Sequence, residues 1–580
     1  MRRPSPRLVR ALLLAVAVAA FVGLGAVWLW QYRRGHPVDI DEAGYLSIAV
    51  NDYRSLHDTG LGGLWDAFLS PSIQAPLMTA LTAPVFAVAG TGILTGLLVP
   101  LALGGVMLLA AYGLGREVGG ARLGWLTLAL TAGTPVVIGY SRSYNFAIAS
   151  GAAAAVMLWA IARSRTFERL GWSVAAGAAI GLVALSRTLT LAFLPSLVVV
   201  GLVALAVGPR RGRRLAGLAV AAGVSLVVAG PWYQRNGEAV LDYLASYGYG
   251  RGRTTYGDDQ SVLSLESWRA TAVYVVSNTF VPLAVIWAVG LVGLLVAAAL
   301  AWRRDGLRRA LLRTARSPLL PSALWVVWCL AALTSSGNKG TGFLAPVVPG
   351  VAVLVAWAVL RLPRPAARTA VALTVAVVAL NTVVGMFPTA GWAQPRQVAV
   401  PWIDHATVYS GRGIIQGYVG YARPDLPTGQ LPDREARRWH RAVDQLTRDL
   451  DELGPGRVFS GFGFRHRLVN VNTVQLEQLL DGGEAIPMTM VDPVATPNDE
   501  QAMTEWLTEG STSSLCLLLV ARGTRMEIEP VVDADLMAQA ARQAGFHRRA
   551  TVDLPDHRTF VVWRRPSSCP VTEGATATSR

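Results

Sequence analysis

The sequence predicts a polytopic α-helical membrane protein of about eleven spans, with outer juxtamembrane helices and a C-terminal extracytoplasmic α/β domain. Of its 580 residues, 52% are hydrophobic and only 15% are charged. The apolar residues are gathered into runs of about 20, which is the length that crosses a bilayer. This composition excludes a soluble globular protein. The net charge of +15 comes from arginine clusters between the runs, a placement that indicates membrane orientation rather than nucleic-acid binding.

Eleven apolar runs are expected to cross the membrane. They fall at residues 11–30, 92–114, 123–140, 146–162, 172–186, 189–207, 215–231, 271–301, 318–334, 341–360 and 369–388. The first run follows a basic segment, as a signal peptide would, but it is longer than a signal-peptide core of about 7 to 15 residues. It is therefore expected to be an uncleaved span with a cytoplasmic amino end.

The arginine clusters fix the expected orientation. They occur in alternate connections, and the positive-inside rule places these connections in the cytoplasm. This holds only if the shorter apolar stretch at 76–90 does not cross, so it is predicted to be a juxtamembrane or re-entrant helix on the outer side. The predicted location is the cytoplasmic (plasma) membrane, with the chain after about residue 389 outside.

The last third of the chain has a different character. We expect a transmembrane domain at 1–388, an extracytoplasmic α/β domain at 389–566 and a disordered tail at 567–580. The middle part predicts helices at 433–452 and 533–545, strands at 457–460 and 514–520, and a hairpin of 548–553 with 559–563. Cys516 and Cys569 share an oxidising compartment, so a disulfide and a buried Cys516 with a free Cys569 are equal alternatives.

Three carboxylates stand together directly after the first span: Asp39, Asp41 and Glu42. Residues 41–51 have the pattern of an amphipathic helix lying on the membrane, with Asp41 in its first turn. The simpler alternative for an acid at this position is that it acts as a helix cap or a dipole partner and has no role in catalysis. Neighbouring residues on a helix point about 100° apart, so Asp41 and Glu42 cannot do the same job.

Asp41-Glu42-x-x-Tyr45 after a first span resembles the opening motif of the GT-C class of membrane glycosyltransferases. This class includes protein O-mannosyltransferases and lipid A aminoarabinose transferases. Further pieces follow in the same order over about residues 10–360: Gln74-Ala75-Pro76, Tyr140-Ser141-Arg142, Ser186-Arg187-Thr188, the run 231–236, and Asn338-Lys339 before Pro346 and Pro349. The chain departs from the family pattern in two places. Relatives often have a basic residue and two prolines near position 74, and a second acid where this chain has Asn145 and Phe146.

The resemblance implies transfer of a sugar from a polyprenyl-phosphate donor to a glycan, lipid or protein acceptor on the outer face. A lipid phosphate leaves as a stable anion, so the reaction needs cations and one general base rather than two carboxylates. Asp41 is the candidate base of an inverting transfer, with Glu42 orienting the site and Asp39 as the substitute acid. The candidate substrate-binding residues are Tyr45, Arg142, Arg187, Arg235 and Lys339.

Each of these residues also has a simpler explanation. Arginines at span ends often contact lipid headgroups, which is an equal alternative for Arg142 and Arg235. Phosphate binding is favoured for Arg187, which has almost no loop around it, and for Lys339, the single lysine. The histidines and cysteines have no metal-ligand spacing, so no metal site is expected, and the need for a divalent ion is left open.

A transporter or flippase for a lipid-linked or anionic solute is the alternative from another class, and a noncatalytic scaffold is a third. Transporters favour inverted repeats and polar groups at mid-membrane. This sequence has no evident repeat, and its polar residues gather at the expected outer boundary. The sequence therefore favours a transferase, with the bilayer and a lipid-linked sugar as partners and without nucleic acid.

Overall fold

The computed structural model describes residues 5–250, 264–337, 339–340, 342–387, 395–410, 433–453, 458–492, 496–521, 527–528, 531–555 and 558–569. The chain divides into two compact units. The first comprises Met1–Gln31, Asp52–Gly90 and Leu94–Ile415, and the second comprises Tyr32–Asn51, Thr91–Ile93 and Gln416–Arg580. The acidic segment that follows the first helix therefore belongs to the same unit as the C-terminal part of the chain.

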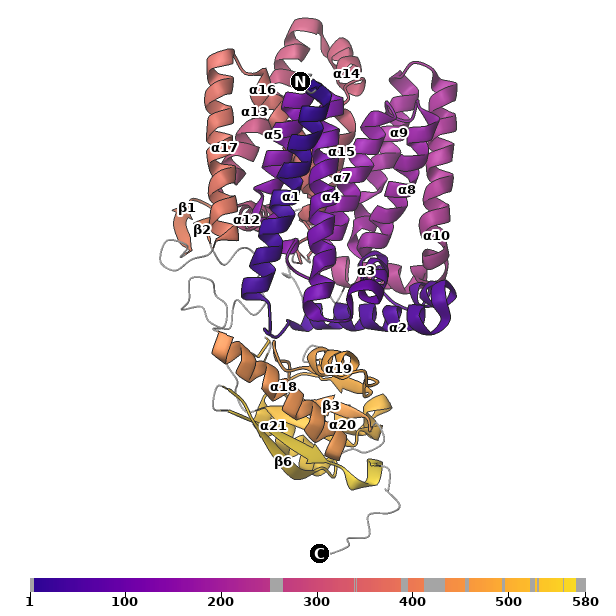
Figure 1. Ribbon diagram of the computed structural model, residues 1–580, viewed down its shortest axis with the longest axis vertical. Coiled ribbons are helices and arrows are strands. Elements are labelled where there is room, and N and C mark those ends of the chain that lie inside the picture. Colours follow the sequence, from indigo (N-terminus) through magenta and orange to yellow (C-terminus); the bar gives the residue numbers. More distant parts are fainter. Residues whose placement is uncertain are drawn as a thin grey trace, which may run out of the picture. The chain divides into compact units, whose positions relative to one another are not determined.

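The first unit is a helix bundle (Figure 1). Its helices, three of which (α1, α2 and α4) also have residues in the second unit, are α1 (Pro6–Tyr32), α2 (Ile40–Phe68), α3 (Leu77–Ala89), α4 (Ile93–Gly119), α5 (Ala121–Ala132), α6 (Pro135–Tyr140), α7 (Phe146–Arg163), α8 (Leu170–Ser186), α9 (Pro195–Val207), α10 (Arg211–Tyr249), α12 (Leu265–Thr279), α13 (Val281–Asp305), α14 (Leu307–Ala315), α15 (Leu320–Ser335), α16 (Val348–Arg361) and α17 (Arg364–Met386). Two short 3-10 turns, η1 (Thr188–Phe193) and η2 (Ala345–Val347), and a hairpin of β1 (Arg396–Val400) and β2 (Asp404–Tyr409) complete it.

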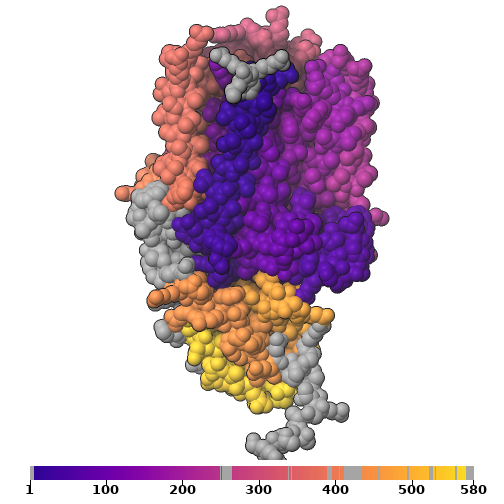
Figure 2. Space-filling model, in the orientation of Figure 1, coloured from indigo at the N-terminus to yellow at the C-terminus, as the bar shows by residue number. Residues whose placement is uncertain are grey.

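Small residues let these helices pack closely. A Cβ atom on Gly177 of α8 would lie 2.4 Å from the carbonyl oxygen of Ala221 in α10, so the two backbones meet directly. Close approach through small residues is typical of helices packed in lipid. In contrast, α1 lies along the surface of the unit, where Leu12 and Leu13 are exposed, as an apolar helix facing lipid would be (Figure 2).

Among the described residues, seven helical stretches are long and apolar enough to span a membrane: α1, α4, α7, Thr188–Val207, α10, α13 and α17. The α14–α15 pair, bent by 94°, would make an eighth. The other expected spans are helical but shorter, as in α8 and α16, or divided, as in α5 and α6. The chain is a multi-pass membrane protein, as predicted, but the count of eleven is not confirmed.

Two expected elements have different bounds in the structure. The run 271–301 is not one helix, because Phe280 has a left-handed φ of 63° and Pro282 follows it, so α12 ends and α13 begins there. The run expected at 215–231 lies within the longer helix α10, which continues past Pro231 as far as Tyr249. The fall in hydropathy after residue 231 therefore does not mark the end of the helix.

The second unit contains a five-stranded sheet in the order β4-β3-β5-β7-β6, with β4, β3 and β5 parallel and β7 and β6 antiparallel. Its strands are β3 (Ser460–Phe462), β4 (Met488–Met490), β5 (Leu517–Ala521), β6 (His547–Asp553) and β7 (Thr559–Arg564). Its helices are α18 (Asp433–Leu453), α19 (Val471–Leu480), α20 (Glu500–Thr508) and α21 (Ala534–Gln543). Short 3-10 turns lie at η4 (Gly510–Ser514) and η5 (Pro566–Ser568).

Alternating side chains of β5 separate two cores. Leu517 and Leu519 pack with α18 and α19, whereas Leu518 and Val520 pack with α20 and α21. The predicted α/β character, both helices and the hairpin are confirmed, although the strand expected at 457–460 begins only at Ser460.

Two other expectations for this part of the chain have different outcomes. Cys516 and Cys569 form a disulfide, which decides between the two alternatives. The boundary after residue 388 and the tail from residue 570 lie outside the described residues, so both stay predictions.

Candidate functional site

The acidic segment begins helix α2, and Asp39 caps it. The backbone N–H of Asp41 donates to Asp39 Oδ1 at 2.9 Å, and the N–H of Ala43 donates to the Asp39 carbonyl at 2.9 Å. Asp41 lies in the first turn, as expected, and its side chain is exposed. Because the capping function falls on Asp39, it does not account for the acid at position 41.

Glu42 is fully buried and has a dedicated cation. Arg33, which is 5% exposed, donates through Nη2 to Glu42 Oε2 at 2.5 Å and through Nη1 to Oε1 at 3.3 Å. A two-point guanidinium–carboxylate contact fixes both partners in orientation as well as in position. Glu42 thus anchors the start of α2. Sequence reasoning missed Arg33, although its position just after the first span was a usable signal.

The electrostatics of the segment depend on the C-terminal part of the chain. Burial raises the pKa of Asp39 well above its ordinary value, and the neighbouring charges of Asp41 and Glu42 raise it further. The positive charge of Arg467 opposes this rise. A residue more than 400 positions away in the sequence therefore acts on the acidic segment.

Asn472, in the first turn of α19, holds the same segment directly. Its Nδ2 donates to the carbonyl of Ile40 at 2.8 Å. A Cβ atom on Gly44 would lie 2.9 Å from that Nδ2 atom, so the contact needs glycine at position 44. The position of Asn472 is itself fixed by Asn470, which forms a capping box with Thr473 at the start of α19.

One buried acid was not singled out from the sequence. Asp52 of α2 is 5% exposed, and burial raises its pKa from 3.8 to about 6, against a lowering hydrogen bond from Thr79. Its charge also reaches Tyr144, whose hydroxyl donates to Thr82 Oγ1 at 2.6 Å. Its spacing from Asp41, eleven residues or about three helical turns, was the signal that could have drawn attention to it.

Arg142 is held by the protein itself. It is 3% exposed, its Nε donates to the Ile138 carbonyl at 3.0 Å, and its Nη1 donates to the Gly385 carbonyl at 2.9 Å. Its guanidinium also lies over the Trp28 ring, 4.0 Å from the centroid. These contacts give Arg142 a structural role that requires no ligand.

Arg187 and Lys339 both contact residues of the segment between α15 and η2. The Arg187 guanidinium lies over the Phe343 ring at 4.0 Å from its centroid. Lys339 donates from Nζ to the Ser336 carbonyl at 3.1 Å. Tyr274 joins the two, because its hydroxyl donates to the Gly340 carbonyl at 3.0 Å and is within electrostatic reach of Arg187.

The loop 72–76 forms hydrogen bonds with the residue that follows Arg187 and with the residue that follows Arg235. Thr188 donates from Oγ1 to the Ile73 carbonyl at 2.7 Å, and Asn236 accepts from the Ser72 N–H at 2.8 Å. Arg235 itself is exposed. In the same loop, the Oε1 atom of Gln74 is buried and has no hydrogen-bond donor among the described residues. A buried acceptor of this kind is unusual unless a ligand satisfies it.

The first unit also contains an apolar cavity of about 220 Å³. It is lined by Leu189, Leu191, Ala192, Phe193, Leu241, Leu244, Gly248, Ala332, Leu333 and Ser336. Its wall thus includes residues of η1, which starts directly after Arg187. It also includes Ser336, whose carbonyl accepts the hydrogen bond from Lys339. The cavity is therefore linked to Lys339 through the hydrogen bond to Ser336, and to Arg187 through the chain at the start of η1.

Tyr45 is half-buried in the first turns of α2. Two further tyrosines, Tyr243 and Tyr247, lie on α10 with ring centroids 4.7 Å apart.

Among the described residues, one group of side chains could share a metal ion. The donor atoms of His440, Asp444 and Glu477 lie within 4.8 Å of one another. His440 Nδ1 is already 3.3 Å from Glu477 Oε1, and this hydrogen bond raises the pKa of His440. The hydrogen bond between His440 and Glu477 thus joins α18 to α19.

Comparisons with known proteins agree with this architecture. Residues 73–233 match the family model of dolichyl-phosphate-mannose-protein mannosyltransferases, a stretch that includes the motifs at 74–76, 140–142 and 186–188. No curated protein sequence matches the chain.

Three solved structures are similar in fold. ArnT from Cupriavidus metallidurans bound to undecaprenyl phosphate shares 15% identity, with a TM-score of 0.52 over 95% of this chain and 97% of that chain. The archaeal oligosaccharyltransferase AglB from Archaeoglobus fulgidus, in complex with an inhibitory peptide and a dolichol-phosphate, shares 14% identity, with a TM-score of 0.54 over 87% and 69%. The arabinofuranosyltransferase AftD from Mycobacteria shares 13% identity, with a TM-score of 0.51 over 97% and 40%. The chain has the fold of the GT-C class of membrane glycosyltransferases, as its motifs predict.

Proposed function

We propose that this protein is a membrane glycosyltransferase that moves a sugar from a polyprenyl-phosphate donor to an acceptor on the outer face of the cytoplasmic membrane. The observation that carries the proposal is an apolar cavity whose lining residue Ser336 binds Lys339 and whose η1 wall directly follows Arg187 in the chain. Two cations near an apolar cavity suit an amphiphilic ligand that has an anionic headgroup and a hydrocarbon chain. The polyprenyl phosphates in the related ArnT and AglB structures support the same class of ligand.

In this proposal, Arg187, Lys339 and Gln74, with the adjoining cavity, form the donor site. The two cations stabilise the phosphate as it takes the electrons of the breaking glycosidic bond, because fixed positive charge is most effective where negative charge develops. The Oε1 atom of Gln74 accepts a hydrogen bond from a sugar hydroxyl, which removes the cost of its burial. The isoprenoid units nearest the phosphate occupy the cavity.

Asp41 acts as the general base. Its carboxylate takes the proton of the acceptor as the acceptor attacks the anomeric carbon, and attack opposite the departing phosphate inverts that carbon. Glu42 cannot share this task, because both of its oxygens are bound by Arg33. Asp39 is committed to capping α2 through its own side chain. Asp41 is the member of the trio whose side chain is both exposed and not used as a cap.

The C-terminal domain has a positioning role in the same proposal. Asn472 binds the Ile40 carbonyl, one residue before Asp41, and Arg467 tempers the negative charge around Asp39. The domain thereby determines where the base stands. This assigns it a task in catalysis even when it makes no contact with the acceptor.

Donor binding tests the proposal directly. Undecaprenyl phosphate should bind the purified full-length protein, and Arg187→Ala or Lys339→Ala should weaken that binding by about tenfold. Arg304→Ala, a substitution of an exposed arginine at the end of α13, is the matched control and should leave binding unchanged. Equal affinity in the wild type and both donor-site variants would refute the donor site.

A further inference from the structure

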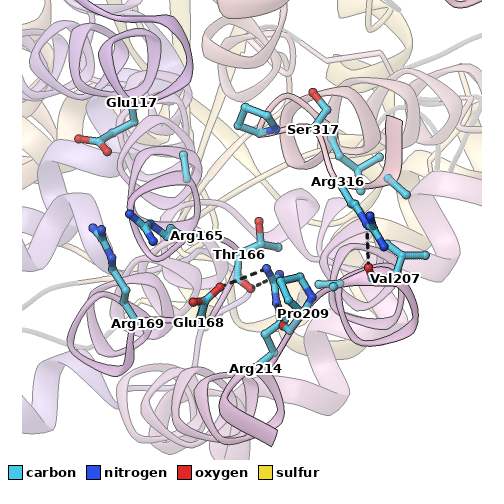
Figure 3. Close-up of a pocket in the computed structure, with 16 residues that line it drawn as sticks. Glu117, Arg165, Thr166, Glu168, Arg169, Val207, Pro209, Arg214, Arg316 and Ser317 are labelled. Atoms are coloured by element: carbon cyan, nitrogen blue, oxygen red, sulfur yellow. Dashed lines mark hydrogen bonds and ion pairs between the residues drawn. The ribbon is translucent and has the colours of Figure 1, made fainter. Parts of the chain in front are cut away.

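A second cavity of about 560 Å³ lies in the first unit, away from the proposed donor site (Figure 3). Its charged lining consists of Arg165, Arg169, Arg214, Arg316, Glu117 and Glu168. These residues come from the loop between α7 and α8, from the start of α10, from the α14–α15 junction and from α4. The cavity is therefore formed where several helices of the bundle begin or end.

The α7–α8 loop has an unusual and well-fixed backbone. Arg165, Thr166 and Phe167 are three consecutive non-glycine residues with left-handed φ values of 55°, 55° and 66°. Such residues are strained and persist only where their surroundings hold them. Here Arg214 Nη1 donates to the Thr166 carbonyl at 3.1 Å, and Ser164 Oγ accepts from the Phe167 N–H at 2.8 Å. The loop thus presents Arg165 and Arg169 from a rigid frame.

The charges in the cavity do not balance. Glu168 is bound by Arg210 at 2.6 Å and by Arg214 at 3.4 Å, and Glu117 is bound by Arg163. Both carboxylates are consequently neutralised by these ion pairs.

The remaining cations have no carboxylate of their own. Within the described part of the chain, no acid lies within 4.0 Å of Arg165, Arg169 or Arg316. Arg316 donates instead to the Val207 carbonyl at 3.1 Å (Figure 3). Three arginines around one hollow repel each other, and an anion between them would relieve that repulsion.

We propose that this cavity holds the phosphate-bearing headgroup of an anionic phospholipid. Guanidinium groups bind phosphate oxygens through paired N–H donors, and basic pockets between membrane helices select anionic lipids. Free phosphate offers the same oxygens, but the cavity is larger than that ion requires, and apolar residues such as Ala204 and Leu320 form part of its wall. A headgroup attached to its glycerol fits both parts of the lining.

Native mass spectrometry of the full-length protein with added phosphatidylglycerol, phosphatidylcholine or inorganic phosphate tests the proposal. Phosphatidylglycerol should be retained in preference to phosphatidylcholine, and Arg165→Gln combined with Arg169→Gln should weaken that retention by about tenfold. Arg308→Gln combined with Arg309→Gln removes the same charge from exposed positions on α14 and should change nothing. Arg316→Gln should reproduce part of the loss, which keeps the test open if the double variant does not fold.

Three outcomes would overturn the proposal. Equal losses in the cavity variant and the α14 control would indicate only general surface charge. Equal retention of the two lipids would exclude headgroup selection. Inorganic phosphate that competes fully with phosphatidylglycerol at equal concentration would make the free ion the ligand.

Discussion

The acidic segment and the proposed donor site satisfy their polar groups in different ways. In the segment, Arg33 binds Glu42, Asp39 caps α2, and Asn472 binds the Ile40 carbonyl. In the proposed donor site, by contrast, Gln74 Oε1 is buried without a hydrogen-bond donor among the described residues. The first region is organised by the protein itself, and the second retains capacity for a ligand. Changes in the first should therefore appear as lost stability, and changes in the second as lost affinity.

The largest effect should follow from breaking the Arg33–Glu42 pair. Arg33→Met or Glu42→Gln leaves one buried charge without its partner, which typically costs about 3 to 5 kcal/mol of unfolding free energy. The two substitutions together should recover most of this loss, because no buried charge then remains. Thermal unfolding of the purified protein measures it. Single variants as stable as the wild type would show that the pair is not the anchor.

Asp52 is a buried acid with no ion pair to an arginine among the described residues, so its burial should make the stability of the protein depend on pH. Its folded pKa is raised to about 6, so its contribution to stability is complete below the unfolded value of about 3.8 and is lost as the pH rises through 6. Asp52→Asn should therefore gain up to about 3 kcal/mol at pH 7 relative to the wild type, and nothing at pH 3.5. Unfolding measured at both pH values checks this sign. A variant that is less stable at pH 7 would contradict the account.

The contact between Gly44 and Asn472 should show coupling. Gly44→Ala places a Cβ 2.9 Å from the Asn472 amide and should cost about 1 to 3 kcal/mol, whereas Asn472→Ala should cost about 1 kcal/mol. The double variant should lose less than the sum, because the amide that clashes is gone. Hydrogen exchange of residues 39–46 should rise in each single variant.

Asn498 supplies the control for that pair. It also makes two hydrogen bonds to backbone in the second unit, to the Val531 carbonyl at 2.8 Å and from the Asp533 N–H at 2.8 Å. Asn498→Ala should destabilise the protein similarly but leave exchange at 39–46 unchanged. Strictly additive losses in the double variant would mean that Gly44 and Asn472 do not interact.

The smallest expected effects are those of replacing Arg142 or Arg187, two arginines at helix ends that we expect to have different roles. Arg142→Ala should lower stability, because its guanidinium binds two carbonyls and a tryptophan ring, and should leave polyprenyl-phosphate affinity unchanged. Arg187→Ala should do the reverse, with an affinity loss of about tenfold, or 1.4 kcal/mol. Unfolding and binding measured on the same preparations separate them. A reversed pattern would exchange their roles.

The sequence indicated features that depend on local composition. Apolar runs, the first-turn position of Asp41 and the hairpin at 547–564 follow from periodicity over a few residues, and the structure contains them. It did not indicate the break at Phe280, because a left-handed residue leaves no trace in hydropathy.

Other features depend on contacts between distant parts of the chain. The partners of the acidic segment could not be found from the sequence, since Asn472 lies 432 residues from Ile40. Asp52 resembled an ordinary helix residue until the packing around it was known. The sequence therefore predicted which types of residue the candidate site contains. It did not predict which of their side chains are bound by other protein groups and which are proposed to bind a ligand.

We propose that Asp41 takes the acceptor's proton and does not contribute to donor binding. Asp41→Asn tests it when polyprenyl-phosphate binding and the glycans formed in cells are measured for the same variant. The account predicts unchanged binding and a fall in transfer of about 10² to 10⁴-fold, while Asp58→Asn, an exposed acid on the same helix, changes neither. Full transfer by the Asp41→Asn variant would contradict it.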